Sequence, residues 1–181
     1  MKKQVILLIE GTPDDTNGNL KIGFGSLLEQ KLRGNMPRIV MGGNKSETCK
    51  KFKNPLQNQA NFLLIDLDAP ESDREQEIIK QGLVDVQESV FFMIHEMEAW
   101  ILSQPNVLDE YYKEKISVKI TRKDHEISNP DDFLQILTKK TEKGAYHKVG
   151  NGVELLKMLS LSKLEESFPD VKRLIQTFLP R

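Results

Sequence analysis

The sequence predicts an α/β protein in which helices flank a parallel β-sheet and a helical extension follows at the C-terminal end. Short, strongly apolar runs bounded by polar segments are typical of the buried strands of parallel sheets. Helical segments separate these runs over the first hundred residues, as right-handed crossover connections require. Beyond about residue 105 the pattern becomes mainly helical. These three features together predict a Rossmann-like layered core with a helical C-terminal region.

Four strands are expected in the core. They are predicted at residues 4–9, 38–41, 61–65 and 89–94. Each is a run of apolar or β-branched residues that ends in polar or glycine residues, which is the pattern of a short buried strand.

Helices are expected between these strands. The first covers residues 20–32, with a buried stripe formed by Ile22, Leu27, Leu28 and Leu32. A second runs to about Phe52 from a cap at Ser46. Two more are expected, one from a capping box at residues 72–75 to about Gly82, and one at residues 96–103 that Pro105 stops.

The second part of the chain reads differently. Residues 116–121 alternate like an edge strand but are equally compatible with a loop, and helices are expected at 129–141, 151–159 and 164–179, the last interrupted at Pro169. We therefore expect an α/β core over residues 1–105 and a helical extension over residues 106–181 that packs on the same domain.

Composition limits the class of protein. The chain has 181 residues, and its single cysteine, Cys49, excludes an internal disulfide and a cysteine-based zinc cluster, which favours a cytoplasmic location. The apolar run near the N-terminus is too short for a signal peptide or a membrane span. The net charge is -1, but residues 19–54 are rich in cations and residues 66–77 contain six acids against one arginine. A basic flank beside an acidic pocket suits an enzyme that holds phosphates.

Carboxylates follow three of the predicted strands. Glu10 ends the first, Asp66 and Asp68 end the third, and Glu96 and Glu98 follow the fourth. Ligand sites of open parallel sheets lie at the carboxyl ends of the strands, so these acids should converge. Clustered carboxylates repel one another unless a hard cation such as Mg²⁺ or Mn²⁺ joins them. The sequence therefore predicts a metal-dependent phosphoryl-transfer site.

The local sequence suggests a role for each candidate residue of the site. Glu10 is a general acid or base or a metal ligand, and the following Gly11 permits close approach of a substrate. Asp14, in the next loop, is a metal ligand or a turn former. Glu96 and Glu98 would point about 200° apart on a helix, so one of them should face the site. Lys148 is either a phosphate ligand or a solvated lysine.

Other chemistries fit less well. A zinc protease is rejected because Ala99 stands where the second histidine of the His-Glu-x-x-His motif belongs. The segment Gly42-Gly43-Asn44 lacks the lysine and serine or threonine of a P-loop. A haloacid-dehalogenase type of site is disfavoured because its Asp-x-Asp motif follows the first strand, where this chain has Glu10.

These motifs resemble those of Toprim domains, which occur in topoisomerases, primases and overcoming-lysogenization-defect (OLD) nucleases. Residues 9–14, Ile-Glu-Gly-Thr-Pro-Asp, resemble the Glu-Gly signature, and residues 64–68, Leu-Ile-Asp-Leu-Asp, resemble the Asp-x-Asp signature. Residues 95–102, 146–150 and the Phe-Pro pair at 168–169 resemble a narrower family of small, stand-alone, uncharacterised Toprim-like bacterial proteins. The resemblance covers nearly the whole chain.

The resemblance implies a Mg²⁺-dependent nuclease. Glu10 would be the general acid/base, Asp66 and Asp68 would bind metal, Asp14 would close the first motif, and Glu96 or Glu98 would add an acid. It also implies an ATPase partner and a place in defence against phage. This chain departs from its relatives in having two aspartates, Asp14 and Asp15, where they often carry one glutamate.

Three functions remain open from the sequence. The first is a nuclease acting on DNA or RNA with Mg²⁺ or Mn²⁺. The second is a non-catalytic Toprim-like module that binds nucleic acid or an ATPase partner. The third is a metal-dependent phosphotransferase or hydrolase of small nucleotides.

Overall fold

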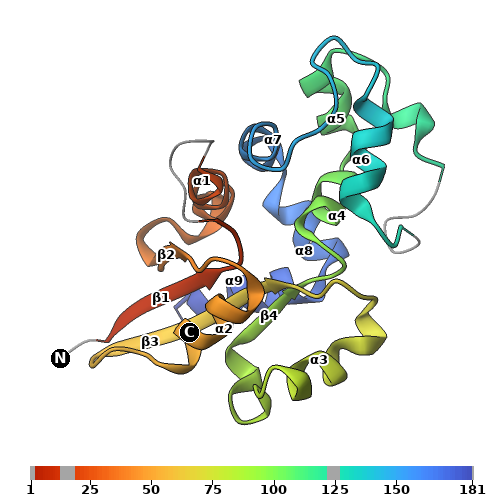
Figure 1. Cartoon of the computed structure of the whole chain (residues 1–181). Coiled ribbons are helices and arrows are strands. Elements are labelled where there is room, and N and C mark those ends of the chain that lie inside the picture. The colour runs from red at the N-terminus through yellow and green to blue at the C-terminus, as the bar shows by residue number, and fades with distance from the viewer. Residues whose placement is uncertain (1–2, 13–18, 122–126, 181) are drawn as a thin grey trace.

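Four parallel strands form the centre of the molecule. The computed structural model describes residues 3–12, 19–121 and 127–180. The strands are β1 (Gln4–Ile9), β2 (Arg38–Met41), β3 (Gln59–Asp66) and β4 (Val90–Met93), and their order across the sheet is β2-β1-β3-β4 (Figure 1). Every neighbouring pair is parallel. The predicted α/β class with a parallel sheet is confirmed.

Helices cover both faces of the sheet and continue through the C-terminal region. In chain order they are α1 (Leu20–Leu32), α2 (Lys45–Lys53), α3 (Arg74–Lys80), α4 (Met97–Leu102), α5 (Pro105–Tyr112), α6 (Pro130–Thr138), α7 (Gly152–Met158), α8 (Leu161–Ser167) and α9 (Pro169–Phe178). Figure 1 shows α4, α5, α6 and α7 gathered beyond the carboxyl ends of the strands. Among the described residues, no helix is both long and apolar enough to cross a membrane.

Alternate residues of β1 divide the core into two layers, because successive side chains of a strand point to opposite faces. Leu7 and Ile9 belong to a hydrophobic cluster that also contains residues of α1, α9 and the C-terminal helices. Ile6 and Leu8 belong to a second cluster, which contains Phe52 of α2 and Ile78 of α3. The sheet therefore lies between two helical layers.

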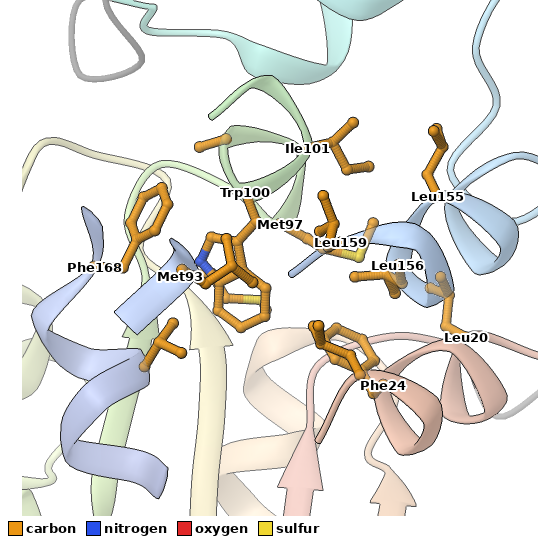
Figure 2. Packing of buried hydrophobic residues seen from close by; sticks show 14 of the residues in the cluster. Leu20, Phe24, Met93, Met97, Trp100, Ile101, Leu155, Leu156, Leu159 and Phe168 are labelled. Atoms are coloured by element: carbon orange, nitrogen blue, oxygen red, sulfur yellow. The ribbon is translucent and has the colours of Figure 1, made fainter. Parts of the chain in front are cut away.

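The C-terminal helices share the larger cluster with the sheet and α1. Trp100 of α4 is 1 % exposed, and its ring packs edge-to-face on Phe24 of α1 with the ring centroids 6.2 Å apart. Phe168 lies 6.3 Å from the same indole (Figure 2). Trp100 is thus a core anchor, and its packing brings α4 over the end of the sheet.

A buried aspartate joins α9 to the sheet. Asp170 is 5 % exposed, and its Oδ2 accepts hydrogen bonds from the Phe92 backbone N–H at 2.6 Å and from Arg74 at 2.8 Å. Its Oδ1 lies 3.3 Å from the Arg173 guanidinium. A buried carboxylate is stable only with such partners, so Asp170 fixes the position of α9 against β4 and α3.

Two predicted helix details are wrong. Asn44, not Ser46, caps α2: its side chain accepts from the Glu47 N–H at 3.0 Å while the Glu47 carboxylate accepts from the Asn44 N–H. This reciprocal pair is a capping box, which satisfies two free donors at once. On α1, Ile22 is 55 % exposed and Phe24 is buried in its place, because Phe24 precedes the buried Leu27 and Leu28 by one helical turn and so lies on their face.

The outcomes of three further expectations differ. Residues 117–119 form a 3-10 turn, so the edge strand considered for residues 116–121 is absent from the described part of this segment. No capping bond forms at the start of α3, where Ser72 donates to its neighbour Asp73 instead. Pro105 does follow the end of α4, but it also begins α5, since proline fits the first turn of a helix.

Candidate active site at the switch point of the sheet

Glu10 and Asp66 meet at the point in the sheet where the strands that follow β1 in the chain are added on its opposite sides. From β1 the chain moves to β2 on one side, and β3 lies on the other side of β1. Such a switch point is the usual position of ligand sites in open α/β sheets. Glu10 directly follows β1 and Asp66 is the last residue of β3, and the Asp66 backbone N–H donates to Glu10 Oε2 at 3.1 Å.

The surroundings of Glu10 raise the pKa of its carboxyl group toward neutral pH. Its half-buried position is the main cause that raises its pKa to about 7, and the negative charge of Asp66 adds to this, while the ammonium of Lys45 opposes it. A general acid or base works best when its pKa lies near the working pH. The neighbouring Gly11 has a φ of +145°, and a side chain there would collide with Met41.

Asp66 is more deeply buried than either Glu10 or Asp68. It is 6 % exposed, its Oδ1 accepts from the Met97 N–H at 3.0 Å, and its Oδ2 accepts from Lys148 Nζ at 3.2 Å. Burial raises the pKa of Asp66, and the charge and hydrogen bond of Lys148 act in the opposite direction. Lys148 lies far along the chain, so the C-terminal region supplies part of this site.

Asp68 lies at the solvent-facing side of the cluster. Its Oδ2 accepts a hydrogen bond from Lys45 Nζ, which also lies 3.6 Å from Glu77. Asp68 and His95 both adopt positive φ values, +56° and +57°, and the Asp68 N–H donates to the His95 carbonyl at 2.7 Å. Non-glycine residues in this conformation are strained and are frequent at functional sites.

Glu98 forms a buried network with two C-terminal residues. It is completely buried, its Oε1 accepts from the Tyr146 hydroxyl at 2.9 Å, and its Oε2 lies 3.4 Å from Lys148 Nζ. Burial raises the pKa of Glu98 to about 7 despite the nearby Lys148. Lys148 therefore bridges Asp66 and Glu98, and those two charges raise its own pKa against the effect of burial.

Glu96 is closer to the cluster than a helical geometry predicts. It precedes α4 in an extended conformation, so the 200° separation expected from a helix does not apply. Its Oε2 accepts from the Asp131 N–H at 3.2 Å, and burial raises its pKa. The charges of Asp66 and Lys148 both act on it. Glu96 and Glu98 thus both border the site.

The structure brings together five of the predicted acids and Lys148, and it adds two residues. Asp14 lies outside the described residues. Lys45 and Tyr146 are parts of the network that the sequence did not single out. Tyr146 stands two residues before Lys148, within a segment already noted, whereas Lys45 carries no local signal.

The carboxylates of the site are suitable ligands for a hard cation, but two of them are in contact with lysine side chains. Glu10, Asp66 and Asp68 offer only carboxylate oxygens, the ligands that Mg²⁺ prefers. Across residues 3–12, 19–121 and 127–180, however, no group of three or more His, Cys, Asp or Glu side chains is arranged to hold a metal ion. The ammonium groups of Lys45 and Lys148 lie against Asp68 and Asp66. The chemistry of the donors fits Mg²⁺, and binding would require these lysine contacts to rearrange.

Comparison with known proteins places the chain in a family. A family model described as a domain of unknown function, DUF4276, matches residues 12–179, and the chain belongs to that family. Neither the curated proteins nor the solved structures contain a match to it.

Proposed function

We propose that this member of the DUF4276 family is a metal-dependent nuclease of the Toprim type that hydrolyses phosphodiester bonds. The observation that carries the proposal is the pairing of Glu10 with Asp66 at the switch point of the sheet, with the Asp66 N–H on Glu10 Oε2 at 3.1 Å. The resemblance of both strand ends to the Toprim signatures supports the same assignment. A phosphoryl-transfer site needs grouped carboxylates and a proton-transfer group, and this edge offers both.

The residues take distinct roles in this proposal. Glu10 transfers the proton, and Glu10, Asp66 and Asp68 would hold Mg²⁺ or Mn²⁺, with Asp14 and Glu96 as further candidate ligands. When bound, the metal would supply an activated water and neutralise charge on the attacked phosphate. Gly11 would approach the substrate with its backbone, because the Met41 side chain fills the position that a side chain of residue 11 would take. Lys148, which Glu98 and Asp66 hold by contacts of 3.4 and 3.2 Å, would pair with a substrate phosphate.

The wider setting is part of the proposal. The substrate would be nucleic acid, and an ATPase partner and a role in phage defence follow from the resemblance to Toprim proteins. A reducing cytoplasm suits the buried free thiol of Cys49.

A cleavage assay tests the proposal. Labelled single- and double-stranded DNA and RNA are incubated with Mg²⁺ or Mn²⁺ and with wild type, Glu10→Gln or Asp66→Asn protein. Glu29→Gln and Asp85→Asn are the matched controls, because both side chains are exposed and lie outside the carboxylate cluster. We expect cleavage by the wild type and both controls and a loss of at least a hundredfold in both site variants, the usual scale for removing a proton-transfer group.

The alternatives give different results. Cleavage that survives both site substitutions would refute the assignment of the site. Metal-dependent turnover of mononucleotides without cleavage of polymers would favour a phosphotransferase or hydrolase of small nucleotides. Nucleic-acid or ATPase binding that is unchanged in Asp66→Asn, with no cleavage under any condition, would favour a non-catalytic module.

A further inference from the structure

A separate groove lies on the α2 side of the sheet, at its β2 edge. It has a volume of about 980 Å³, whereas the pocket beside Asp68 has about 260 Å³. Its floor includes the aliphatic side chains of Ile6, Leu8 and Val40. The groove is open because β2 is an edge strand and α2 packs mainly on β1 and β3. Its size is at the upper end of small-molecule sites.

The rim of the groove carries cations with no intramolecular use. Arg38 and Lys50 line it, and neither side chain has a hydrogen bond or an ion pair within the described ranges of the chain. Lys51 also lines it and donates to the Gly42 carbonyl at 2.7 Å. The acid among the lining residues, Glu47, already accepts from the Asn44 N–H in the α2 capping box. The groove therefore presents free positive charge above an apolar floor.

Two details connect the groove to a polar ligand and to the carboxylate edge. Asn61 lines the groove, and its Oδ1 is buried without a hydrogen-bond partner among the described residues, which costs free energy unless a donor reaches it. Gly43 lines the other end, where it exchanges two 2.9 Å backbone hydrogen bonds with Gly11, the residue after Glu10. The groove thus runs from the amino end of β3 toward the candidate active site.

We propose that this groove binds a nucleotide unit, meaning a phosphate ester that carries a heterocyclic base. Arg38 and Lys50 would contact the phosphate, since guanidinium and ammonium groups are its usual ligands. The flat aliphatic floor would contact the face of the base, and Asn61 Oδ1 would accept from an exocyclic amino group. The unit is either a free nucleotide or one residue of a nucleic-acid strand. This proposal does not require the candidate active site to be catalytic.

Binding is measured in EDTA, so that catalysis and metal play no part. Two fluorescent probes, a labelled 20-nucleotide oligodeoxyadenylate and a labelled ATP analogue, are each titrated with the full-length protein, because adenine carries the exocyclic amino group that Asn61 would bind. The test variant is the double substitution Arg38→Gln and Lys50→Gln. The control variant, Lys163→Gln and Lys172→Gln, removes the same charge from exposed positions on α8 and α9.

We expect at least one probe to bind, with an affinity that falls about tenfold or more in the groove variant and less than twofold in the control. For the oligonucleotide, losing two phosphate contacts should also reduce the slope of log Kd against log salt by about 1.4. Binding of the ATP analogue identifies a free nucleotide as a ligand, and binding of the oligonucleotide alone identifies a strand.

Other results would overturn the proposal. These are equal affinity in wild type and the groove variant, an equal loss in both double variants, or no binding of either probe. Capture of an oligoglutamate peptide without binding of either nucleotide probe would assign the groove to an acidic protein partner. If the wild-type protein binds a probe through Arg38 and Lys50 but cleaves no nucleic acid, the proposed nuclease alone is refuted. If the wild type and the groove variant cleave equally well and bind both probes with equal affinity, the groove proposal alone is refuted.

Discussion

Replacing Glu98 with glutamine is expected to stabilise the protein strongly at pH 8 and only slightly at pH 5. The carboxyl is completely buried, and its pKa is raised from 4.5 to about 7, chiefly by burial. Between these two values the folded protein retains a proton that the unfolded chain has lost. Glu98 therefore lowers stability progressively as the pH rises from about 4.5 to 7.

The size of the effect follows from the shift. A change of about 2.5 pKa units at 1.36 kcal/mol each gives about 3 kcal/mol at pH 8 and less than about 1 kcal/mol at pH 5. Glutamine is neutral at both pH values, and its side-chain oxygen still accepts the hydrogen bond that the Tyr146 hydroxyl donates to Glu98. The glutamine variant should therefore resemble the protein with a protonated Glu98 at every pH.

Urea unfolding in EDTA, followed by the fluorescence of the buried Trp100, measures this effect. With a urea dependence of about 2 kcal/mol per molar for a domain of this size, the midpoint should rise by about 1.5 M at pH 8. Glu29→Gln, on the exposed side of α1, should leave the midpoint nearly unchanged at both pH values. A Glu98→Gln protein that loses stability at pH 8, or that gains equally at pH 5 and pH 8, would refute the reasoning.

Three other substitutions, also measured by urea unfolding, test the contacts of Lys148 with the buried acids and the packing of α9 and α2 against the sheet. Lys148→Met should cost about 2 kcal/mol at pH 8, because two buried carboxylates lose their partly exposed cation, and the loss should shrink on acidification as they protonate. Asp170→Ala should cost about 3 kcal/mol, since it leaves the Phe92 amide of β4 unpaired and removes one of the two carboxylate partners of the partly buried Arg74, whereas the exposed Asp85→Ala should change stability by less than about 0.5 kcal/mol. Gly42→Ala should cost about 1–3 kcal/mol because a Cβ would lie 2.2 Å from a buried threonine hydroxyl of α2, whereas Gly34→Ala, with no atom within 4 Å, should be nearly neutral. If Asp170→Ala and Asp85→Ala, or Gly42→Ala and Gly34→Ala, lost the same stability, the contact assigned to Asp170 or to Gly42 would be contradicted.

The sequence was sufficient to predict the positions of the core strands, because strands that are buried on both faces consist of short apolar runs. The bounds of β1, β2 and α1 agree with those predicted, and those of β3 and β4 differ from the predicted bounds by one or two residues at each end. Burial on both faces leaves little choice for a run such as residues 90–93. The edge strand considered near residue 117 had no such burial behind it, and a few alternating residues do not distinguish a strand from a turn.

The direction in which a helix faces was harder to predict than its position. On α1 the pattern allowed both Ile22 and Phe24 to point inward, and the packing of Trp100 against Phe24 decides between them. At α2 we predicted Ser46 as the cap, whereas the cap is Asn44, a residue type that is equally good at this position. The reciprocal bond with Glu47 favours Asn44, and that Asn-x-x-Glu spacing was present in the sequence.

In the candidate site, too, some residues could be predicted from the sequence and others could not. A general rule about the carboxyl ends of parallel strands was enough to bring Glu10 and Asp66 together. The cations were not accessible in this way, because Lys45 and Lys148 reach Asp68 and Asp66 across 23 and 82 positions of the chain. Long-range pairs of this kind leave no periodic signal in a single sequence.

The ionisation of the acids depends on tertiary structure even more directly. Burial is the largest cause of the raised pKa of both Glu10 and Glu98. For Glu98 that burial arises where α4 and the segment around Tyr146 cover the end of the sheet. The segment around Tyr146 therefore does more than complete the core, because together with α4 it sets the proton affinity of Glu98. Truncating or loosening that region should lower the pKa of Glu98 toward that of an exposed glutamate, even though no acid has been changed.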